Sequence, residues 1–319
     1  MSKSKFENQL PMLDDFLLHI QANNYSPETL YNYERDLKTF ENFLHDEMNS
    51  LPFSKVSKKT IEQFKAYLNS TDRKTAAGAK SEKRLSSGSI NRTLTSLRRY
   101  LSYLIDMDED APVPPQSIKL LRMGKKHGQV AEMEDLVRLI ESPMKYEQNK
   151  QIALRNRAML ETLFASGMRI SELINLKRIQ IDKTGKVFIE GKGKKQRLIY
   201  LTQRAQGHIH AYLKTRSDDS PFLFIPNRGL NAGDKNKHIS PNYLQMKIKR
   251  YRELLGINIP TSAHSLRHGF ATYLAEQGAN PVALQVLLGH ESLETTTRYV
   301  HASDKYAEDT HAKFHPLKK

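Results

Sequence analysis

The sequence predicts a mainly α-helical protein with a small antiparallel β-sheet, divided into two domains. Apolar residues recur at helical spacing over most of the chain, beginning with residues 8–21. Short segments that alternate apolar and polar residues lie between turns near the middle of the chain, as expected for hairpin strands. Residues 111–129 combine prolines, glycines and a switch of charge, which is typical of a linker. We therefore expect an N-terminal domain over residues 1–110 and a second domain over residues 130–319.

The N-terminal domain is predicted to contain four helices. The first covers residues 8–21, and the second begins at residues 26–28, where Ser-Pro-Glu supplies an N-cap, a proline at the first helical position and an acid in the first turn. The third begins after Ser57, and the fourth covers residues 89–105. Residues 69–89, which are rich in Ser, Ala, Gly and Lys, are expected to form a loop.

The second domain is predicted to begin with helices over residues 133–141 and 152–166. Gly167 follows the second of these helices and suits the left-handed position that often ends a helix. Strands are expected at residues 179–182, 186–190 and 197–201. This part of the domain would therefore place a small sheet directly after two helices.

The last third of the chain is predicted to be helical again. After a polar loop over residues 227–241, a basic helix is expected over residues 242–255. A further helix covers residues 264–277, and shorter helices follow at Pro281 and after the N-cap Ser292. The chain folds back twice here, which would bring separated polar residues into one pocket.

The charge of the chain favours a polyanionic partner. It has 50 Lys and Arg against 35 Asp and Glu, a formal net charge of +15, and phosphate neutralisation with release of counterions drives nucleic-acid binding. A charge run is often only a solvated face, but the imbalance between residues 73 and 99 favours a surface that faces phosphates. The candidates for DNA contact are Arg73, Lys74, Lys80, Arg84, Arg92, Arg98, Arg99, Lys247, Lys249 and Arg250.

The composition excludes other classes of protein. The chain has no cysteine, so it contains no disulfide, thiol nucleophile or cysteine-bound metal. Hydrophobic residues make up 38% of the 319 residues, but no apolar run has the length needed to cross a bilayer. The N-terminus lacks the apolar segment of a secretory signal. We expect a soluble, cytoplasmic protein without a membrane partner.

Polar residues in the last third of the chain indicate phosphodiester chemistry. His264 and Arg267 lie three apart on a predicted helix and so share a face. The Arg267 guanidinium offers a planar fork of donors for phosphate oxygens, and His264 and His290 can exchange a proton near neutral pH. Tyr299 carries a phenolic oxygen that is a nucleophile once its proton is removed. A second arginine motif upstream contains Arg169.

Other interpretations of these residues are less favoured. His264 and His268 are four apart and could bind a metal, but the chain has no HExxH motif and no cysteine ligand. Arg267 alone could be a surface helix residue, and Tyr299 alone a half-buried aromatic side chain. The joint spacing of these residues, together with the Arg169 motif, favours a site for a phosphodiester.

Four segments resemble the tyrosine recombinase (phage integrase) family, especially its Xer-like members. They are G-x-R-x-S-E-L at residues 167–173, G-K-G-x-K at 191–195, H-x-L-R-H-x-x-A-T at 264–272, and L-G-H at 288–290, followed nine residues after the histidine by the tyrosine of R-Y-V-H. They span about half the chain in the expected order, so together they are highly specific. The resemblance implies a four-helix, SAM-like core-binding domain and an α+β catalytic domain.

The resemblance also implies a catalytic set for phosphodiester cleavage. Its members are Arg169, Lys192, His264, Arg267, His290 and Tyr299. The two arginines would each clamp two non-bridging oxygens with charge-assisted bonds. Lys192, which by itself would be read as an exposed hairpin lysine, would protonate the leaving 5′-oxygen. Glu172 is expected to orient Arg169 or to pack its helix.

The remaining members of the set would supply and activate the nucleophile. Tyrosine has a reference pKa of about 10, so Tyr299 needs help to lose its proton. His264 would be the general base, or at least a donor to the scissile phosphate, and His290 would contact a phosphate oxygen and position Tyr299. His268 and His301 are expected to be structural. The resulting 3′-phosphotyrosine intermediate conserves the bond energy, so neither a cofactor nor a metal is implied.

The biology implied by the resemblance is site-specific recombination of double-stranded DNA through a Holliday junction. The protein would bind a specific target site as a homotetramer, or as a heterotetramer with a related recombinase, and a DNA translocase is a further candidate partner. Chromosome-dimer resolution and mobile-element integration share this chemistry, and both stay open. The alternatives are a type IB topoisomerase and a non-catalytic DNA-binding regulator; the complete catalytic set argues against the regulator.

Overall fold

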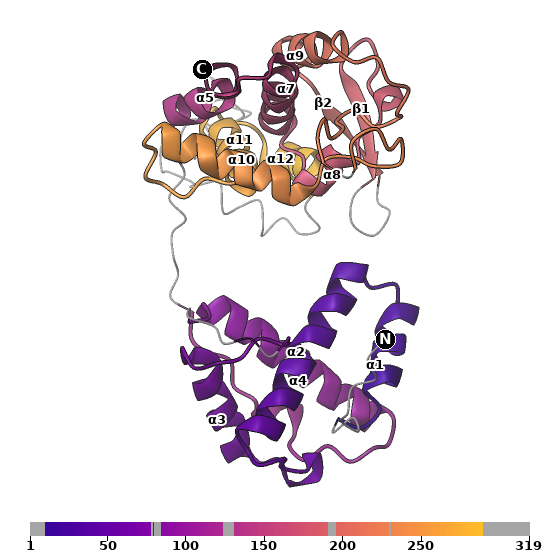
Figure 1. The fold of residues 1–319 in the computed structure, drawn as a ribbon, viewed down its shortest axis with the longest axis vertical. Coiled ribbons are helices and arrows are strands. Elements are labelled where there is room, and N and C mark those ends of the chain that lie inside the picture. Colours follow the sequence, from indigo (N-terminus) through magenta and orange to yellow (C-terminus); the bar gives the residue numbers. More distant parts are fainter. Residues whose placement is uncertain are drawn as a thin grey trace, which may run out of the picture. The chain divides into compact units, whose positions relative to one another are not determined.

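The computed structural model describes residues 10–77, 79, 84–123, 131–190, 196–229 and 231–289. Contacts divide the chain into two units, Met1–Lys126 and His127–Lys319, and each has its own hydrophobic core. The described elements are mostly helices, with one two-stranded antiparallel sheet in the second unit (Figure 1). The predicted fold class is confirmed. No helix within the described ranges is long and apolar enough to cross a membrane.

The first unit contains the four predicted helices. They are α1 (Leu13–Ala22), α2 (Pro27–Asp46), α3 (Lys58–Asn69) and α4 (Ser87–Asp106), with short 3₁₀ helices η1 (Phe53–Lys55) and η2 (Pro115–Ser117). Ser26, Ser57 and Ser86 are the N-caps of α2, α3 and α4, and each hydroxyl accepts a backbone N–H of the first turn. The core is rich in aromatic rings, such as Phe16 packed edge-on against Tyr100 at a centroid distance of 5.5 Å.

Part of the predicted linker packs onto this first core. Val113 and Ile118 are both buried, and Arg98 Nε donates to the Ile118 carbonyl at 2.6 Å. The Asn91 side chain binds both the N–H and the carbonyl of Leu121. The described residues just after position 110 therefore contribute to the first unit, and the placement of the domain boundary stays a prediction.

The second unit is built around α7. Its elements are α5 (Met133–Glu141), α6 (Pro143–Tyr146), α7 (Lys150–Ser166), α8 (Ile170–Ile174), η3 (Arg178–Gln180), β1 (Lys186–Glu190), β2 (Gln196–Tyr200), α9 (Gln203–Leu213), α10 (Pro241–Leu254), α11 (Ala263–Glu276) and α12 (Pro281–Leu288). α7 packs against α6, α9 and α11, and the last two are labelled beside it in Figure 1. Most of its residues are buried around its whole circumference, as expected for a central helix.

The sheet has two strands where the sequence predicted three. β1 and β2 pair antiparallel, with Val187 opposite Ile199. The predicted strand at residues 179–182 is wrong, because residues 178–180 form the 3₁₀ helix η3 and only Ile181 makes an isolated bridge to Val187. The Gln180 side chain explains the difference. It accepts from the Lys177 N–H at 2.7 Å and donates to the Phe188 carbonyl at 2.9 Å, so a side chain bonds the edge of β1 where a backbone ladder was expected.

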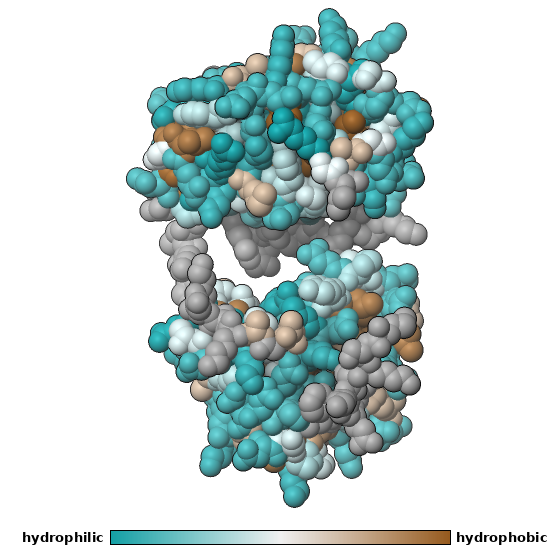
Figure 2. All heavy atoms as spheres, viewed as in Figure 1, coloured by the Kyte–Doolittle hydropathy of each residue, from teal (hydrophilic) through white to brown (hydrophobic). Residues whose placement is uncertain are grey.

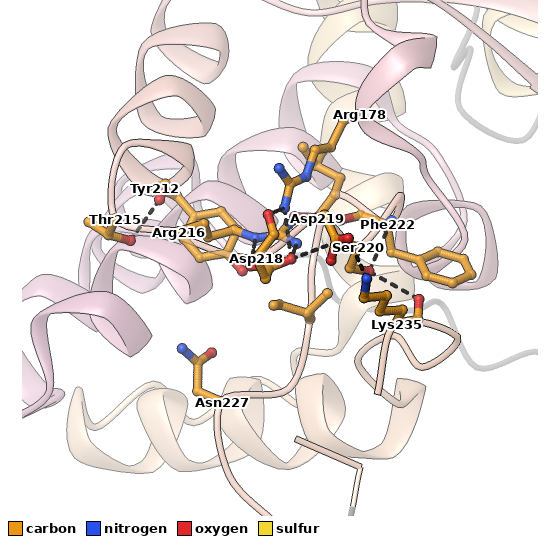
Figure 3. A network of polar contacts seen from close by, with 12 residues as sticks. Arg178, Tyr212, Thr215, Arg216, Asp218, Asp219, Ser220, Phe222, Asn227 and Lys235 are labelled. Atoms are coloured by element: carbon orange, nitrogen blue, oxygen red, sulfur yellow. Dashed lines mark hydrogen bonds and ion pairs between the residues drawn. The ribbon is translucent and has the colours of Figure 1, made fainter. Parts of the chain in front are cut away.

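A cluster of hydrogen bonds between Arg216, Arg178 and Asp218, here called the arginine–aspartate cluster, fixes the segment after α9 (Figure 3). The buried guanidinium of Arg216 donates to both carboxylate oxygens of Asp218 and, at 2.8 Å, to the carbonyls of Phe222 and Leu223. Arg178 adds a bond to Asp218 Oδ1 at 2.8 Å. The hydrogen bonds from Arg216 lower the pKa of Asp218 to about 2. The arginine–aspartate cluster holds the chain in place where Leu223 packs into the core of the second unit.

Candidate active site

The first arginine motif lies where α7 ends. Gly167 caps the helix in the left-handed conformation, at φ 62°, and its N–H donates to the Leu163 carbonyl at 2.9 Å. A Cβ atom at Gly167 would lie 2.4 Å from the Phe270 ring, so glycine is required for both conformation and space. Arg169 follows as the N-cap of α8, and its N–H donates to Glu172 Oε2 at 2.7 Å. The turn thereby fixes the backbone that carries Arg169.

The second arginine motif lies near the start of α11. Ser262 caps this helix by accepting the Ser265 N–H at 3.2 Å. Arg267 is buried, and it donates from Nη1 to the Gly167 carbonyl at 2.7 Å and from Nη2 to the Leu288 carbonyl at 2.6 Å. One guanidinium therefore joins α11 to the end of α7 and to the end of α12.

The C-terminal end of α12 is bound by three guanidinium groups. Arg197 Nε donates to the Leu287 carbonyl at 3.2 Å, Arg267 Nη2 to Leu288 at 2.6 Å, and Arg169 Nη2 to Gly289 at 3.1 Å. The last carbonyls of a helix have no partner within the helix and lie at the negative end of its dipole, so arginines suit this position. The contacts fix the chain immediately before position 290. The structure thus brings the two predicted arginines to one place.

His264 lies near both predicted arginines and is exposed to solvent. Partial desolvation lowers the pKa of His264, and its electrostatic interactions with Arg267, His268 and Arg169 lower it further. The ring is therefore mostly neutral at neutral pH and is able to accept a proton. His268 turns to Thr272, with 3.1 Å between Nδ1 and Oγ1. In the part of the chain that the structure describes, no group of three His, Asp or Glu is placed to hold a metal ion.

The other half of the predicted catalytic set lies outside the described residues. This applies to Lys192, His290 and Tyr299, and to the predicted structural residue His301. Their roles stay predictions. The described residues come close to them in sequence, because Gly289 directly precedes His290 and β1 and β2 flank residues 191–195.

The predicted DNA contacts of the first unit differ in how they are placed. Arg73 is buried. Lys74 binds Asp46 at 2.8 Å, Arg92 binds Asp36 at 2.8 Å, and Arg98 donates to a backbone carbonyl. Arg84 and Arg99 are exposed, and Lys80 lies outside the described residues. The face shown in Figure 2 is mostly hydrophilic on each unit.

The predicted contacts on α10 also differ in exposure, and Lys249 lies 3.9 Å from a Glu253 oxygen. Lys247 binds Glu147 at 2.6 Å and is largely buried. Lys249 and Arg250 are exposed on the same helix. The two exposed cations are therefore better placed to meet a phosphate than Lys247, and all the DNA contacts stay predictions.

Two comparisons with protein-family models decide the family. Residues 130–306 match the phage integrase family, and residues 13–107 match the phage integrase N-terminal SAM-like domain. The chain belongs to the phage integrase family. Both the predicted family and the predicted SAM-like first domain are thus confirmed, and the family's members are DNA strand-transferring enzymes.

Relatives of this family member match it over nearly its whole length. It is 30% identical to tyrosine recombinase XerC of Thermodesulfovibrio yellowstonii, over 96% of this chain and 97% of the relative, and 31% identical to XerC of Pelobacter propionicus, over 94% of each. Solved structures share the fold. XerH recombinase bound to difH substrate has a TM-score of 0.68 at 20% identity, covering 98% of this chain and 91% of XerH. The Tn1549 transposon integrase with a circular intermediate DNA gives 0.68 at 19% identity, covering 94% and 98%.

One residue of the site was not named from the sequence. Arg197 donates to both oxygens of Glu172 at 2.8 Å and to the Leu287 carbonyl, so it contacts the same structures as Arg169. The only sequence signal is its position, two residues after the G-K-G-x-K segment. That position does not predict that Arg197 binds the carboxylate of Glu172, 25 residues upstream.

Proposed function

We propose that this integrase-family chain is a site-specific recombinase that cleaves and rejoins duplex DNA through a 3′-phosphotyrosine intermediate on Tyr299. The observation that carries the proposal is the joint placement of Arg169, Arg267 and His264. Arg267 binds the carbonyl of Gly167, two residues before Arg169, and the charges of both arginines act on His264. Two guanidinium groups beside a neutral imidazole are what a metal-free phosphoryl transfer needs.

The arginines would stabilise the charge that builds on the scissile phosphate. Attack by a phenolic oxygen places additional negative charge on the non-bridging oxygens. Arg169 is 37% exposed and can reach a ligand while Glu172 and the Gly289 carbonyl each hold one of its terminal nitrogens at 3.1 Å. Preorganised donors of this kind need no reorientation during the reaction, which is the main source of their catalytic effect.

Side chains would accept the proton of the nucleophile and donate a proton to the leaving oxygen. His264, whose pKa is lowered, would take the proton of Tyr299 or donate to the phosphate, depending on its tautomer. Lys192 would protonate the leaving 5′-oxygen, and His290 would hold a phosphate oxygen beside Tyr299. The support for these two roles is the match of residues 191–195 and 288–290 to family motifs.

The target DNA can be found and the chemistry tested in two steps. Trapping the protein on DNA in cells and sequencing the attached fragments gives the target site. A nicked suicide duplex containing that site should then form a covalent complex with the wild-type chain, stable on a denaturing gel. Tyr299→Phe should bind the duplex with unchanged affinity and form no complex. An undiminished covalent band from this variant would move the nucleophile to another tyrosine.

We further propose that the functional form is a tetramer on two duplexes. Relatives support DNA as the partner: XerH is described as bound to its difH substrate, and lambda integrase as a dimer bound to a core site. A homotetramer or a heterotetramer with a related recombinase, in the cytoplasm and with or without a DNA translocase, fits a strand exchange between two sites. The trapped sequences separate the two biological roles, because a single chromosomal site supports dimer resolution and the ends of a mobile element support integration.

A further inference from the structure

Arg197 is the second residue of β2, and its guanidinium makes three hydrogen bonds to two partners. Nη1 donates to Glu172 Oε1 and Nη2 to Glu172 Oε2, both at 2.8 Å, while Nε donates to the Leu287 carbonyl at 3.2 Å. The side chain is only 9% exposed. A bidentate bond of this kind requires the planar fork of arginine, because lysine offers a single point charge.

Glu172 lies between two arginines. Its carboxylate accepts from Arg197 and, at 3.1 Å, from Arg169 Nη1, and it also accepts the backbone N–H of Arg169 at 2.7 Å. Burial opposes ionisation, but the hydrogen bonds from Arg197 and from the Arg169 backbone outweigh it and hold the pKa of Glu172 below its usual range. The ionised carboxylate therefore connects the position of Arg197 to that of Arg169.

An independent observation at Gly289 supports the connection. Gly289 adopts φ 62°, and a Cβ atom there would lie 2.9 Å from Arg197 Cδ and 3.0 Å from its Nε and Nη1. The glycine of the L-G-H segment is therefore needed both for its left-handed conformation and for the space that Arg197 fills. The same residue gives its carbonyl to Arg169 at 3.1 Å.

We propose that Arg197 is a positioning residue of the recombinase site. It acts through Glu172 on Arg169, and through the Leu287 carbonyl on the end of α12 from which His290 follows. All three nitrogens of its guanidinium are bound to protein groups, so we assign it no contact with the phosphate. The inference rests on the proposed function, since it assigns Arg197 to the site that cleaves DNA.

The test compares single-turnover cleavage with DNA affinity. Arg197→Lys keeps the charge but loses the fork, so cleavage of the nicked suicide duplex should slow by about 100-fold, the loss that a displacement of about 1 Å can cause. The dissociation constant for the same duplex should stay close to that of the wild type. Arg204→Lys is the matched control: Arg204 likewise binds carboxylates, those of Glu141 and Glu161, outside the site, and its variant should cleave at the wild-type rate.

A double-mutant cycle separates positioning from a general loss of structure. Glu172→Gln should slow cleavage to a similar extent, and the double variant should be no slower than the slower single variant, because both changes break one connection. Additive losses, an unchanged rate for Arg197→Lys, or a loss of affinity matching the loss of rate would each overturn the inference. If Arg197→Lys fails to fold, Glu172→Gln alone tests the inference, because it should slow cleavage and leave the dissociation constant for DNA unchanged. Absence of a covalent complex with the wild-type chain would instead reject the proposed function.

Discussion

Arg267 donates from Nη2 to the carbonyl of Leu288 at 2.6 Å. This bond joins the arginine of the H-x-L-R-H segment to the helix end that directly precedes His290. A second bond, from Nη1 to the Gly167 carbonyl at 2.7 Å, joins the same guanidinium to the turn that carries Arg169. Arg267 therefore helps to assemble the site that we propose it serves.

The turn at the end of α7 should not tolerate a side chain. Gly167→Ala puts a Cβ atom 2.4 Å from the Phe270 ring at a positive φ, so we expect a loss of about 2–4 kcal/mol in the free energy of unfolding. Gly207→Ala is the control, because Gly207 lies inside α9 with no atom within 4 Å of an added Cβ. That variant should gain about 0.5–1 kcal/mol. Urea unfolding followed by circular dichroism measures both; equal stability of the two variants would contradict the steric account.

The arginine–aspartate cluster of Figure 3 should make the free energy of unfolding depend on pH in the acid range. The pKa of Asp218 is about 2 in the folded chain, against an ordinary value of 3.8. A lowered pKa stabilises the fold fully above the unfolded value and loses that contribution as the pH falls from about 3.8 to about 2. Asp218→Asn should therefore be less stable than the wild type at neutral pH, and the difference should shrink across this interval. A difference that stays constant from neutral pH to the acid limit would show that the carboxylate charge is not its cause.

Lys192 should matter only when the leaving oxygen needs a proton. With Lys192→Ala, cleavage of normal DNA should slow by about 10²–10⁴-fold, the usual contribution of a general acid. Cleavage of a duplex with a 5′-bridging phosphorothioate should be much less affected, because a thiolate leaves without protonation. Single-turnover rates on the two substrates are the measurement, and equal losses on both would remove Lys192 from the acid role.

The two units should bind DNA more tightly together than apart. The structure places Ile118 in the first core, so the chain is best divided into fragments 1–126 and 127–319. Log affinity should fall with log salt by about 0.9 per phosphate neutralised, so each fragment should show a smaller slope than the intact chain. Affinity should also fall, because the link between the units makes the second contact intramolecular. If fragment 127–319 matched the full chain in both respects, the first unit would not be a DNA clamp.

Local sequence patterns predicted most of the described helices, but not α6, α8 or α9. Ser26 caps α2 as predicted, and α3 begins after Ser57 as predicted, whereas α4 begins at Ser87, two residues before the predicted start. Apolar spacing also predicted which faces of these helices are buried. The motifs also predicted that Arg169 and Arg267 belong to one site. Both side chains bind carbonyls at the end of α12, and their catalytic roles stay predictions.

Pairing over long sequence separations could not be predicted in the same way. Arg92 lies in the basic run that favoured a phosphate-facing surface, yet it binds Asp36, 56 residues away. Arg197 looked like an ordinary strand residue, and only the fold brings it to Glu172. Gln180 has strand-like neighbours, but its side chain captured the hydrogen bonds that a strand would have made. Arg92 and Arg197 are placed by carboxylate partners that are distant in sequence. At Gln180 the side chain competes with the backbone for hydrogen bonds.

The identity of the residue that is covalently linked to DNA tests the proposed mechanism most directly. The wild-type chain should be trapped on a nicked duplex containing its target site, digested with protease and nuclease, and the nucleotide-bearing peptide sequenced by mass spectrometry. We predict one modified peptide, from the segment that contains Tyr299, carrying the 3′-phosphate of the cleaved strand on the phenolic oxygen. A phosphate attached to any other residue, or a modified peptide with a 5′-phosphate, would contradict the account.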